Sequence, residues 1–139
     1  MNSSDPAPAS NTRAGLLSRG SFILVVDDDP EVLKMIEAIL GAQGWTVKAA
    51  LDAAGAFALI ESSPTPPVLV ICDVIMKGID GLELARRLLA RVPRLRAIFI
   101  SGHLADVSWW PKDLRQCPFL PKPFTNEELI AAVREALSS

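Results

Sequence analysis

Two patterns of apolar and polar positions alternate along the chain from about residue 21 onward. Continuous apolar runs, typical of strands covered on both faces, are interleaved with segments in which apolar residues recur at helical spacing. Strands are expected at residues 21–26, 45–49, 68–72, 95–100 and 119–120. Helices are expected at residues 30–40, 52–61, 81–92 and 125–137.

Start signals support the first and last of these helices. Asp29, Pro30 and Glu31 offer an N-cap, a proline at the first helical position and an early acid. Thr125 and Glu128 have the spacing of a capping box. The buried side of the first helix is expected among its apolar residues at helical spacing, which are Val32, Met35, Ile36, Ile39 and Leu40.

The alternation of strands and helices predicts an α/β fold with a doubly wound parallel sheet. Parallel strands need crossover connections, and these connections usually carry helices. The interval between the fourth and fifth strands departs from the pattern, because Trp109-Trp110-Pro111 interrupts the helix expected over residues 104–116. We therefore expect a short or distorted helix there.

Composition and charge narrow the possible functions. The 139 residues suffice for one domain, expected at 21–139, and residues 1–20, rich in Ser, Asn, Ala and Pro, are expected to form a flexible tail. A net charge of −2 gives no basic field for nucleic acid, and Cys72 and Cys117 fit no disulfide framework or metal motif. Without a membrane-spanning run or signal-peptide pattern, we expect a cytoplasmic location and neither a nucleic-acid nor a membrane partner.

Reactive side chains follow four of the five predicted strands. Asp27 and Asp28 follow the first strand, and Asp73 follows the third. Ser101 follows the fourth strand, and Lys122 follows the fifth. Open α/β sheets bind their ligands at the carboxyl ends of the strands. We therefore expect these five side chains to converge on one edge of the sheet.

Such a cluster of acids needs positive charge beside it. Two like charges about 4 Å apart repel by about 4 kcal/mol at an effective dielectric constant near 20. Lys122 supplies one charge, and hard oxygen ligands without sulfur or imidazole favour Mg²⁺ or Mn²⁺. Together these groups point to phosphoryl chemistry, in which an aspartate is a known nucleophile.

Four segments resemble the receiver domain of bacterial response regulators, the phosphoacceptor module of two-component signalling. In the family's order they are ILVVDDDP (23–30), VICDVIM (70–76) with GIDG (78–81), ISGH (100–103) and FLPKPF (119–124). The resemblance covers roughly residues 21–137. It implies a flavodoxin-like sheet with strand order 2-1-3-4-5 and a cis bond between Lys122 and Pro123.

The resemblance also implies a role for each strand-end residue. Asp73 is the expected phosphoacceptor, which takes phosphate from a phosphohistidine of a histidine kinase or phosphotransfer protein. Ser101 and Lys122 are expected to contact the phosphoryl group. The expected metal ligands are Asp27, Asp28, Asp73 and the backbone carbonyl of Ile75. The domain is expected to catalyse only its own phosphorylation and dephosphorylation.

Signalling is expected through protein contacts of the fourth helix, fifth strand and last helix. Phe119 occupies the family's switch position. Trp109 and Trp110 are candidates for a docking or self-association surface, a homodimer included, because neighbouring helical positions cannot both face a core. The alternative is that both rings pack under a distorted loop. Lys77 replaces the family's usual proline; it and His103 are expected to be exposed residues without a role.

Two other interpretations remain open beside a stand-alone receiver, which is the leading expectation because the printed chain ends just after the last predicted helix. A degenerate receiver would bind partners without phosphorylation, although the chain keeps the acids and the lysine. A phosphatase of the haloacid dehalogenase type would use Asp27 and Asp29, but Pro30-Glu31 replaces the expected hydroxyl residue. Phosphate would land on Asp73 in a receiver and on Asp27 in the phosphatase.

Overall fold

The computed structural model describes residues 20–76, 80–102, 112–114 and 117–138. At its centre is a five-stranded parallel sheet in the order β2-β1-β3-β4-β5, so the predicted α/β class and strand order are confirmed. The strands are β1 (Ile23–Val26), β2 (Val47–Ala50), β3 (Leu69–Asp73), β4 (Arg96–Ser101) and β5 (Phe119–Pro121).

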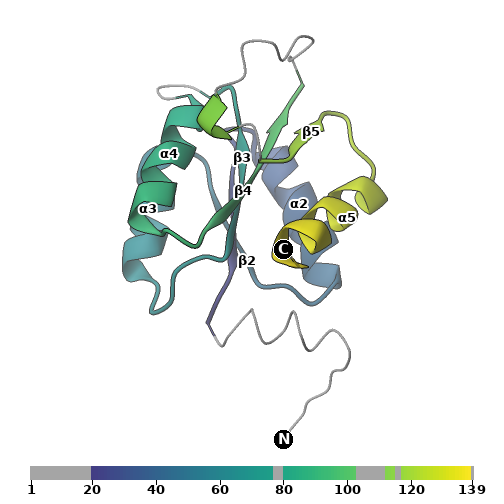
Figure 1. The fold of residues 1–139 in the computed structure, drawn as a ribbon. Helices are drawn as coiled ribbons and strands as arrows, with labels where there is room; N and C mark the ends of the chain where they lie inside the picture. Colours follow the sequence, from purple (N-terminus) through teal and green to yellow (C-terminus); the bar gives the residue numbers. More distant parts are fainter. Residues whose placement is uncertain (1–19, 77–79, 103–111, 115–116, 139) are drawn as a thin grey trace, which may run out of the picture.

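Helices cover both faces of the sheet, with α3 and α4 on one side and α2 and α5 on the other (Figure 1). Their bounds are α2 (Pro30–Ala42), α3 (Ala53–Ser62), α4 (Gly81–Arg91) and α5 (Asn126–Ser138). Alternate strand residues enter opposite apolar clusters. Val70 and Cys72 of β3 pack on the α3 and α4 side, whereas Leu69 and Ile71 pack on the α2 and α5 side.

The helices begin where side-chain oxygens cap them. The Asp29 carboxylate accepts from the Glu31 N–H at 2.9 Å and caps α2, as predicted. The predicted capping box of α5 is present in both directions, because Thr125 N–H donates to the Glu128 carboxylate at 2.8 Å and Glu128 N–H donates to the Thr125 hydroxyl oxygen at 3.0 Å. Asp80 caps α4, and its carboxylate accepts from the Glu83 N–H at 2.8 Å.

The buried face of α2 agrees with the expected one except at two residues. Ile36 and Leu40 reach the core and Val32 and Ile39 pack against it, as predicted. Leu33 is buried as well, whereas Met35 is 40% exposed. Residues 33, 36 and 40 lie one above another on a helix of 3.6 residues per turn, and Met35 lies about 100° to one side of this row. The apolar residues of α2 fit two overlapping faces of the helix, and packing against the sheet buries the face that includes Leu33 and excludes Met35.

Between β4 and β5 the structure describes a single 3₁₀ turn, η1 (Lys112–Leu114), in which Leu114 is buried. Trp109 and Trp110, which were predicted to interrupt a helix, lie outside the described residues, as do Lys77 and His103. Among the described helices, none is both long and apolar enough to cross a membrane.

Candidate functional site

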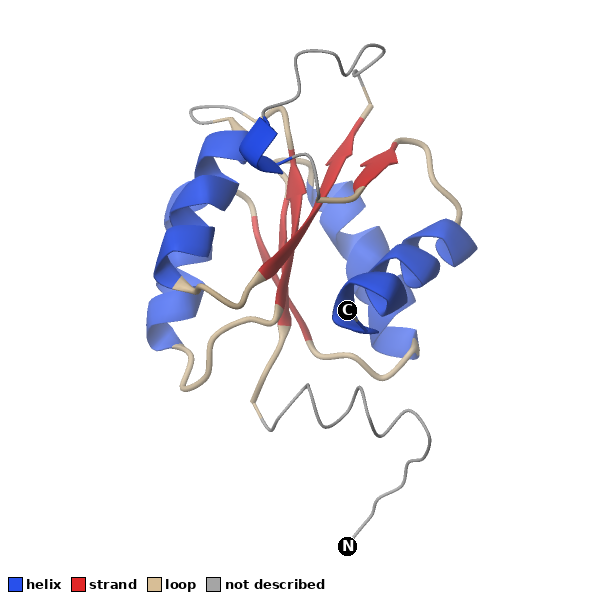
Figure 2. Ribbon diagram, in the orientation of Figure 1, coloured by secondary structure: helices blue, strands red, loops and turns tan. Residues whose placement is uncertain are grey.

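All five strands run in the same direction, so their carboxyl ends meet at one edge of the sheet (Figure 2). Asp73 is the last residue of β3, and Ser101 is the last residue of β4. Asp27 directly follows β1, and Lys122 directly follows β5. The fold therefore brings the predicted residues to the edge where open α/β sheets bind ligands.

Three carboxylates form the centre of this edge. One oxygen atom each of Asp27, Asp28 and Asp73 lies within 4.8 Å of the other two. Asp27 is fully buried and Asp73 is 6% exposed, whereas Asp28 is exposed to solvent. The cluster thus has a closed inner side and an open side from which an ion or a phosphoryl donor has access.

Lys122 supplies the positive charge at this cluster. Its Nζ donates to Oδ2 of Asp27 at 3.0 Å and to Oδ2 of Asp73 at 3.4 Å. Its backbone N–H donates to the Ser101 carbonyl at 2.9 Å, which fixes the start of the lysine beside β4. The Lys122-Pro123 bond is cis, as predicted. One amine therefore joins two acids from separate strands.

Backbone N–H groups hold the remaining oxygens of the two buried acids. Oδ1 of Asp27 accepts from the Asp29 N–H at 2.9 Å, and Oδ1 of Asp73 accepts from the Ile75 N–H at 3.2 Å. Both carboxylates are therefore oriented by their own strand-to-helix loops. Each acid is oriented by an N–H two residues later in the chain, whereas the two acids lie close together because β1 and β3 are neighbours in the sheet.

Burial dominates the electrostatics of Asp73. Desolvation, helped by the neighbouring Asp27 charge, raises the pKa of the Asp73 carboxyl above its ordinary value of 3.8, although Lys122 and the Ile75 N–H oppose the shift. Burial acts against the charged form of Lys122, yet its hydrogen bonds and charge pairs with Asp27 and Asp73 raise the pKa of the lysine. One amine does not offset all the negative charge at this edge.

The donor set fits a hard divalent cation. The described acids offer three carboxylate oxygens to a common point, and the described residues place no other group of three His, Cys, Asp or Glu side chains so closely. Oxygen ligands with one open side suit Mg²⁺ or Mn²⁺, which keep several waters. Asp27, Asp28 and Asp73 are therefore the residues able to hold such an ion.

Other predicted residues are placed differently. The Ile75 side chain is 51% exposed beside the acidic cluster, and its carbonyl remains a predicted ligand. Phe119 begins β5, pairs with Phe99 in register and packs half-buried against the core on the α3 and α4 side. Trp109 and Trp110 are outside the described residues, so the docking surface assigned to them stays a prediction.

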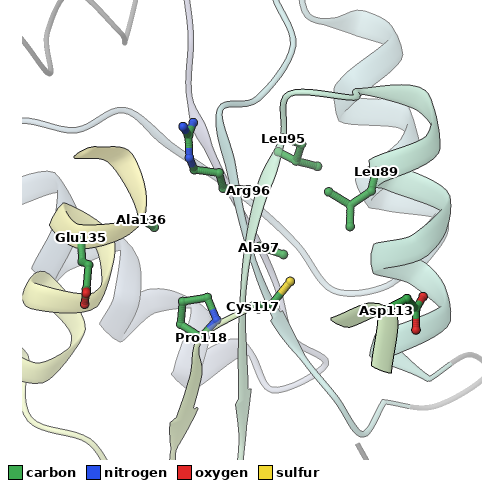
Figure 3. Close-up of a pocket in the computed structure, with 9 residues that line it drawn as sticks. All are labelled: Leu89, Leu95, Arg96, Ala97, Asp113, Cys117, Pro118, Glu135 and Ala136. Carbon is green, nitrogen blue, oxygen red and sulfur yellow. The ribbon is translucent and has the colours of Figure 1, made fainter. Parts of the chain in front are cut away.

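A separate hollow of about 610 Å³ lies near the amino end of β4 (Figure 3). Leu89 of α4, Ala97 of β4 and Ala136 of α5 contribute to its wall, together with Cys117. It contains none of the predicted site residues, so the acidic edge and this hollow are two distinct regions of the domain.

Two residues at the acidic edge were not predicted to matter. A Cβ added at Gly81 would lie 1.9 Å from the Asp73 carbonyl oxygen, so only glycine fits there. Cys72 was expected to be merely a small buried apolar residue, yet its Sγ contacts the carbonyl oxygens of Asp73 and Gly81. The sequence signal for Cys72 was its position directly before Asp73, and the signal for Gly81 was its position at the start of a predicted helix.

Comparison with known proteins gives a consistent match. The profile of the response regulator receiver domain family matches residues 23–134. The nitrogen assimilation regulatory protein NtrX of Azorhizobium caulinodans is 31% identical over 125 residues, which cover 84% of this chain and 26% of NtrX. The chain spans between 13% and 49% of the length of such curated relatives.

Solved structures share the fold. A response regulator receiver protein from Sinorhizobium medicae superposes with a TM-score of 0.76 at 30% identity, over 87% of this chain and 97% of that one. The response regulator TrrA from Thermotoga maritima, solved in complex with Mg²⁺-BeF, gives a TM-score of 0.71 at 25% identity, over 84% of this chain and 98% of that one. The chain belongs to the response regulator receiver domain family.

Proposed function

We propose that this receiver domain accepts a phosphoryl group on Asp73 from a phosphohistidine of a histidine kinase or phosphotransfer protein. The observation that carries the proposal is the placement of the Asp73 carboxylate 3.4 Å from Lys122 Nζ and beside two further acids. A carboxylate next to a fixed cation and a potential metal site suits phosphoryl transfer, in which positioning and charge neutralisation provide most of the catalysis.

Asp73 suits the acceptor role better than Asp27. Both Asp27 oxygens are committed to short bonds, with Asp29 N–H at 2.9 Å and Lys122 Nζ at 3.0 Å, and the residue is fully buried. Asp73 makes longer bonds, at 3.2 Å and 3.4 Å, and keeps some exposure. This difference disfavours the haloacid dehalogenase alternative, which requires phosphate on Asp27.

The proposed step transfers one phosphoryl group between two nucleophiles. An Asp73 carboxylate oxygen attacks phosphorus, an O–P bond forms, and the N–P bond breaks with its electron pair returning to the donor histidine. Lys122 Nζ contacts a phosphoryl oxygen, and the Ser101 hydroxyl donates to another. Asp27, Asp28, Asp73 and the Ile75 carbonyl would hold Mg²⁺ or Mn²⁺, which neutralises phosphoryl charge when bound.

The proposal extends to partners and location. Receiver domains partner histidine kinases, and we infer that the phosphorylated domain signals through protein contacts near β5 and α5, with Phe119 as the switch residue and Trp109 and Trp110 as contact residues. A homodimer is one form such a contact would take. Both cysteines are free thiols, which suits the reducing cytoplasm.

Incubation with Mg²⁺ and acetyl phosphate tests the acceptor role. Intact-mass measurement should show a gain of about 80 Da, one phosphoryl group, in the wild-type chain. The adduct should be absent from Asp73→Asn and present, although more slowly formed, in Asp28→Asn. Omitting the divalent ion should prevent the reaction.

The alternatives give different results in the same experiment. A wild-type chain that gains no mass and shows no spectral change with beryllium fluoride would be a degenerate receiver. An adduct that persists in Asp73→Asn but disappears in Asp27→Asn would indicate the phosphatase chemistry.

A further inference from the structure

Cys72 lies directly before Asp73 in β3, and its fully buried side chain points to the α4 side of the sheet. Its Sγ is 3.5 Å from the carbonyl oxygen of Asp73 and 3.6 Å from the carbonyl oxygen of Gly81. Both distances suit a thiol S–H donor, which has one proton and serves one carbonyl at a time. The thiol thus bridges the end of β3 and the first residue of α4.

The backbone around this thiol is tightly packed. The Gly81 N–H donates to the Val74 carbonyl at 2.7 Å, and no Cβ fits at Gly81 because the Asp73 carbonyl oxygen would lie 1.9 Å away. The start of α4 therefore rests directly on the main chain of the residue that carries the acceptor carboxylate. Because the Cys72 thiol contacts the Asp73 carbonyl oxygen, a change in the Cys72 side chain alters the surroundings of this carbonyl.

The thiol acts here as a hydrogen-bond donor. An S–H group is a weak donor, and the carbonyl oxygens of Asp73 and Gly81 lie within its reach at 3.5 Å and 3.6 Å. The side chain is fully buried, as is typical of structural rather than reactive cysteines.

We propose that Cys72 is a positioning residue for the phosphoacceptor, and that its S–H fixes the Asp73 carbonyl against the start of α4. This inference rests on the proposed function of Asp73. The Asp73 carboxylate must meet phosphorus in line, and in the unphosphorylated structure its orientation is set by its bonds to the Ile75 N–H and to Lys122 Nζ. Small displacements of a reacting group reduce rates strongly, so the main chain beneath the carboxylate matters.

Three substitutions separate donation from packing. Cys72→Ser keeps a donor, Cys72→Val fills the apolar space without a donor, and Cys72→Ala removes both. With acetyl phosphate and Mg²⁺, we expect Val and Ala to be phosphorylated about threefold more slowly than wild type, as for the loss of one weak hydrogen bond. We expect Ser to stay within about twofold of wild type.

Stability should follow the opposite order. Measured by urea unfolding, Cys72→Val should be more stable than Cys72→Ser, because valine fills the apolar space around this position and the smaller, polar serine buries less apolar surface. A purely structural role predicts that phosphorylation rate and stability change together. A positioning role predicts instead that Cys72→Ser is phosphorylated faster than Cys72→Val but is less stable. A packing role does not produce this reversal.

The second cysteine provides a matched control. Cys117 is half-buried and points toward Ala97 in the hollow near the amino end of β4, far along that strand from Ser101 (Figure 3). Cys117→Ala should leave the phosphorylation rate unchanged. Equal rates for Cys72→Val and Cys72→Ser, or a loss of rate in Cys117→Ala as large as in Cys72→Ala, would overturn the inference.

A measurement on the unphosphorylated protein separates this inference from the proposed function. The NMR amide shifts of Val74 and Leu82, whose N–H groups share peptide bonds with the two carbonyls, should move in Cys72→Val and stay close to wild type in Cys72→Ser. Unchanged shifts in Cys72→Val would show that the thiol does not hold the strand end. A wild-type chain that takes no phosphate, with the expected shifts, would instead overturn the proposed function.

Discussion

The acidic edge of the sheet and the outer surface of α4 use the same ion-pair chemistry in different surroundings. Lys122 meets Asp27 at 3.0 Å, where the side chains are 24% and 0% exposed. Arg86 meets Asp113 at 2.9 Å, where they are 41% and 58% exposed. Equal distances therefore do not mean equal energies, because water screens the second pair and is excluded from much of the first.

Glycines show the same contrast. Gly81 at the acidic edge has no room for a Cβ, whereas Gly41 near the end of α2 has nothing within 4 Å of one. The edge is crowded because a strand, a loop and a helix start meet there around a carboxylate. The residue types allowed at this edge are therefore limited by contacts between different elements, whereas those allowed on the helix surfaces are limited mainly by the helix itself.

The largest expected effect breaks the backbone contact at the edge. Gly81→Ala should lower the free energy of unfolding by about 3 kcal/mol, the upper range for overpacking, because the Asp73 carbonyl or the start of α4 must move. Phosphorylation by acetyl phosphate should be nearly lost. Urea unfolding and intact mass measure the two effects.

Gly41→Ala is the matched control for this substitution. It adds a methyl group in open space on a helix and should raise the free energy of unfolding by about 0.5 kcal/mol. If both glycine variants have the same stability, the close approach at Gly81 is not a constraint.

Removal of the amine tests the buried ion pairs. Lys122→Met should lower the free energy of unfolding by about 2 kcal/mol at pH 7 without a divalent ion, because Asp27 and Asp73 stay buried without their cation. Addition of Mg²⁺ should recover much of this stability, whereas phosphorylation should remain slow. A loss below about 0.5 kcal/mol would show that the edge tolerates its uncompensated charge.

Asp73→Asn should have the opposite sign. Since the folded-state pKa of Asp73 is raised above 3.8, ionised Asp73 opposes folding, and stability from this group falls as pH rises from about 4 through the raised value. The variant should be more stable than wild type at pH 7 in the absence of a divalent ion, and should lose this part of the pH dependence.

Mg²⁺ should reverse that advantage. An ion that binds the folded state stabilises it by mass action, and Asp73→Asn removes one of three carboxylates from the site. Thermal unfolding with and without Mg²⁺ would show a larger upward shift for wild type. Equal shifts in both proteins would place the ion elsewhere.

The comparison of the two regions also explains what could be predicted from the sequence. The strands, helices and caps follow local patterns, such as the apolar run of β3 and the capping residue Asp29. The convergence of Asp27, Asp73 and Lys122 followed from one rule about strand ends. These predictions required only the order of the elements.

Contacts that depend on three-dimensional packing were not predictable in this way. The roles of Gly81 and Cys72 depend on how closely α4 approaches the Asp73 carbonyl, a distance that no spacing in the sequence encodes. Met35 was included on the buried side of α2 because the sequence cannot choose between two overlapping apolar faces. Packing against the sheet decided both cases.

The smallest effect is expected on the outer surface. Arg86 forms two bonds to Asp113 of η1, at 2.9 Å and 3.1 Å, yet both side chains are largely exposed, so Arg86→Met should change the phosphorylation rate by less than twofold. The change that Arg86→Met causes in the free energy of unfolding should be smaller in 1 M NaCl than at low salt, because salt screens exposed charges. The change caused by Lys122→Met should persist in 1 M NaCl. If salt weakened both effects equally, the acidic edge would be as hydrated as the helix surface, and burial would not distinguish the two kinds of ion pair.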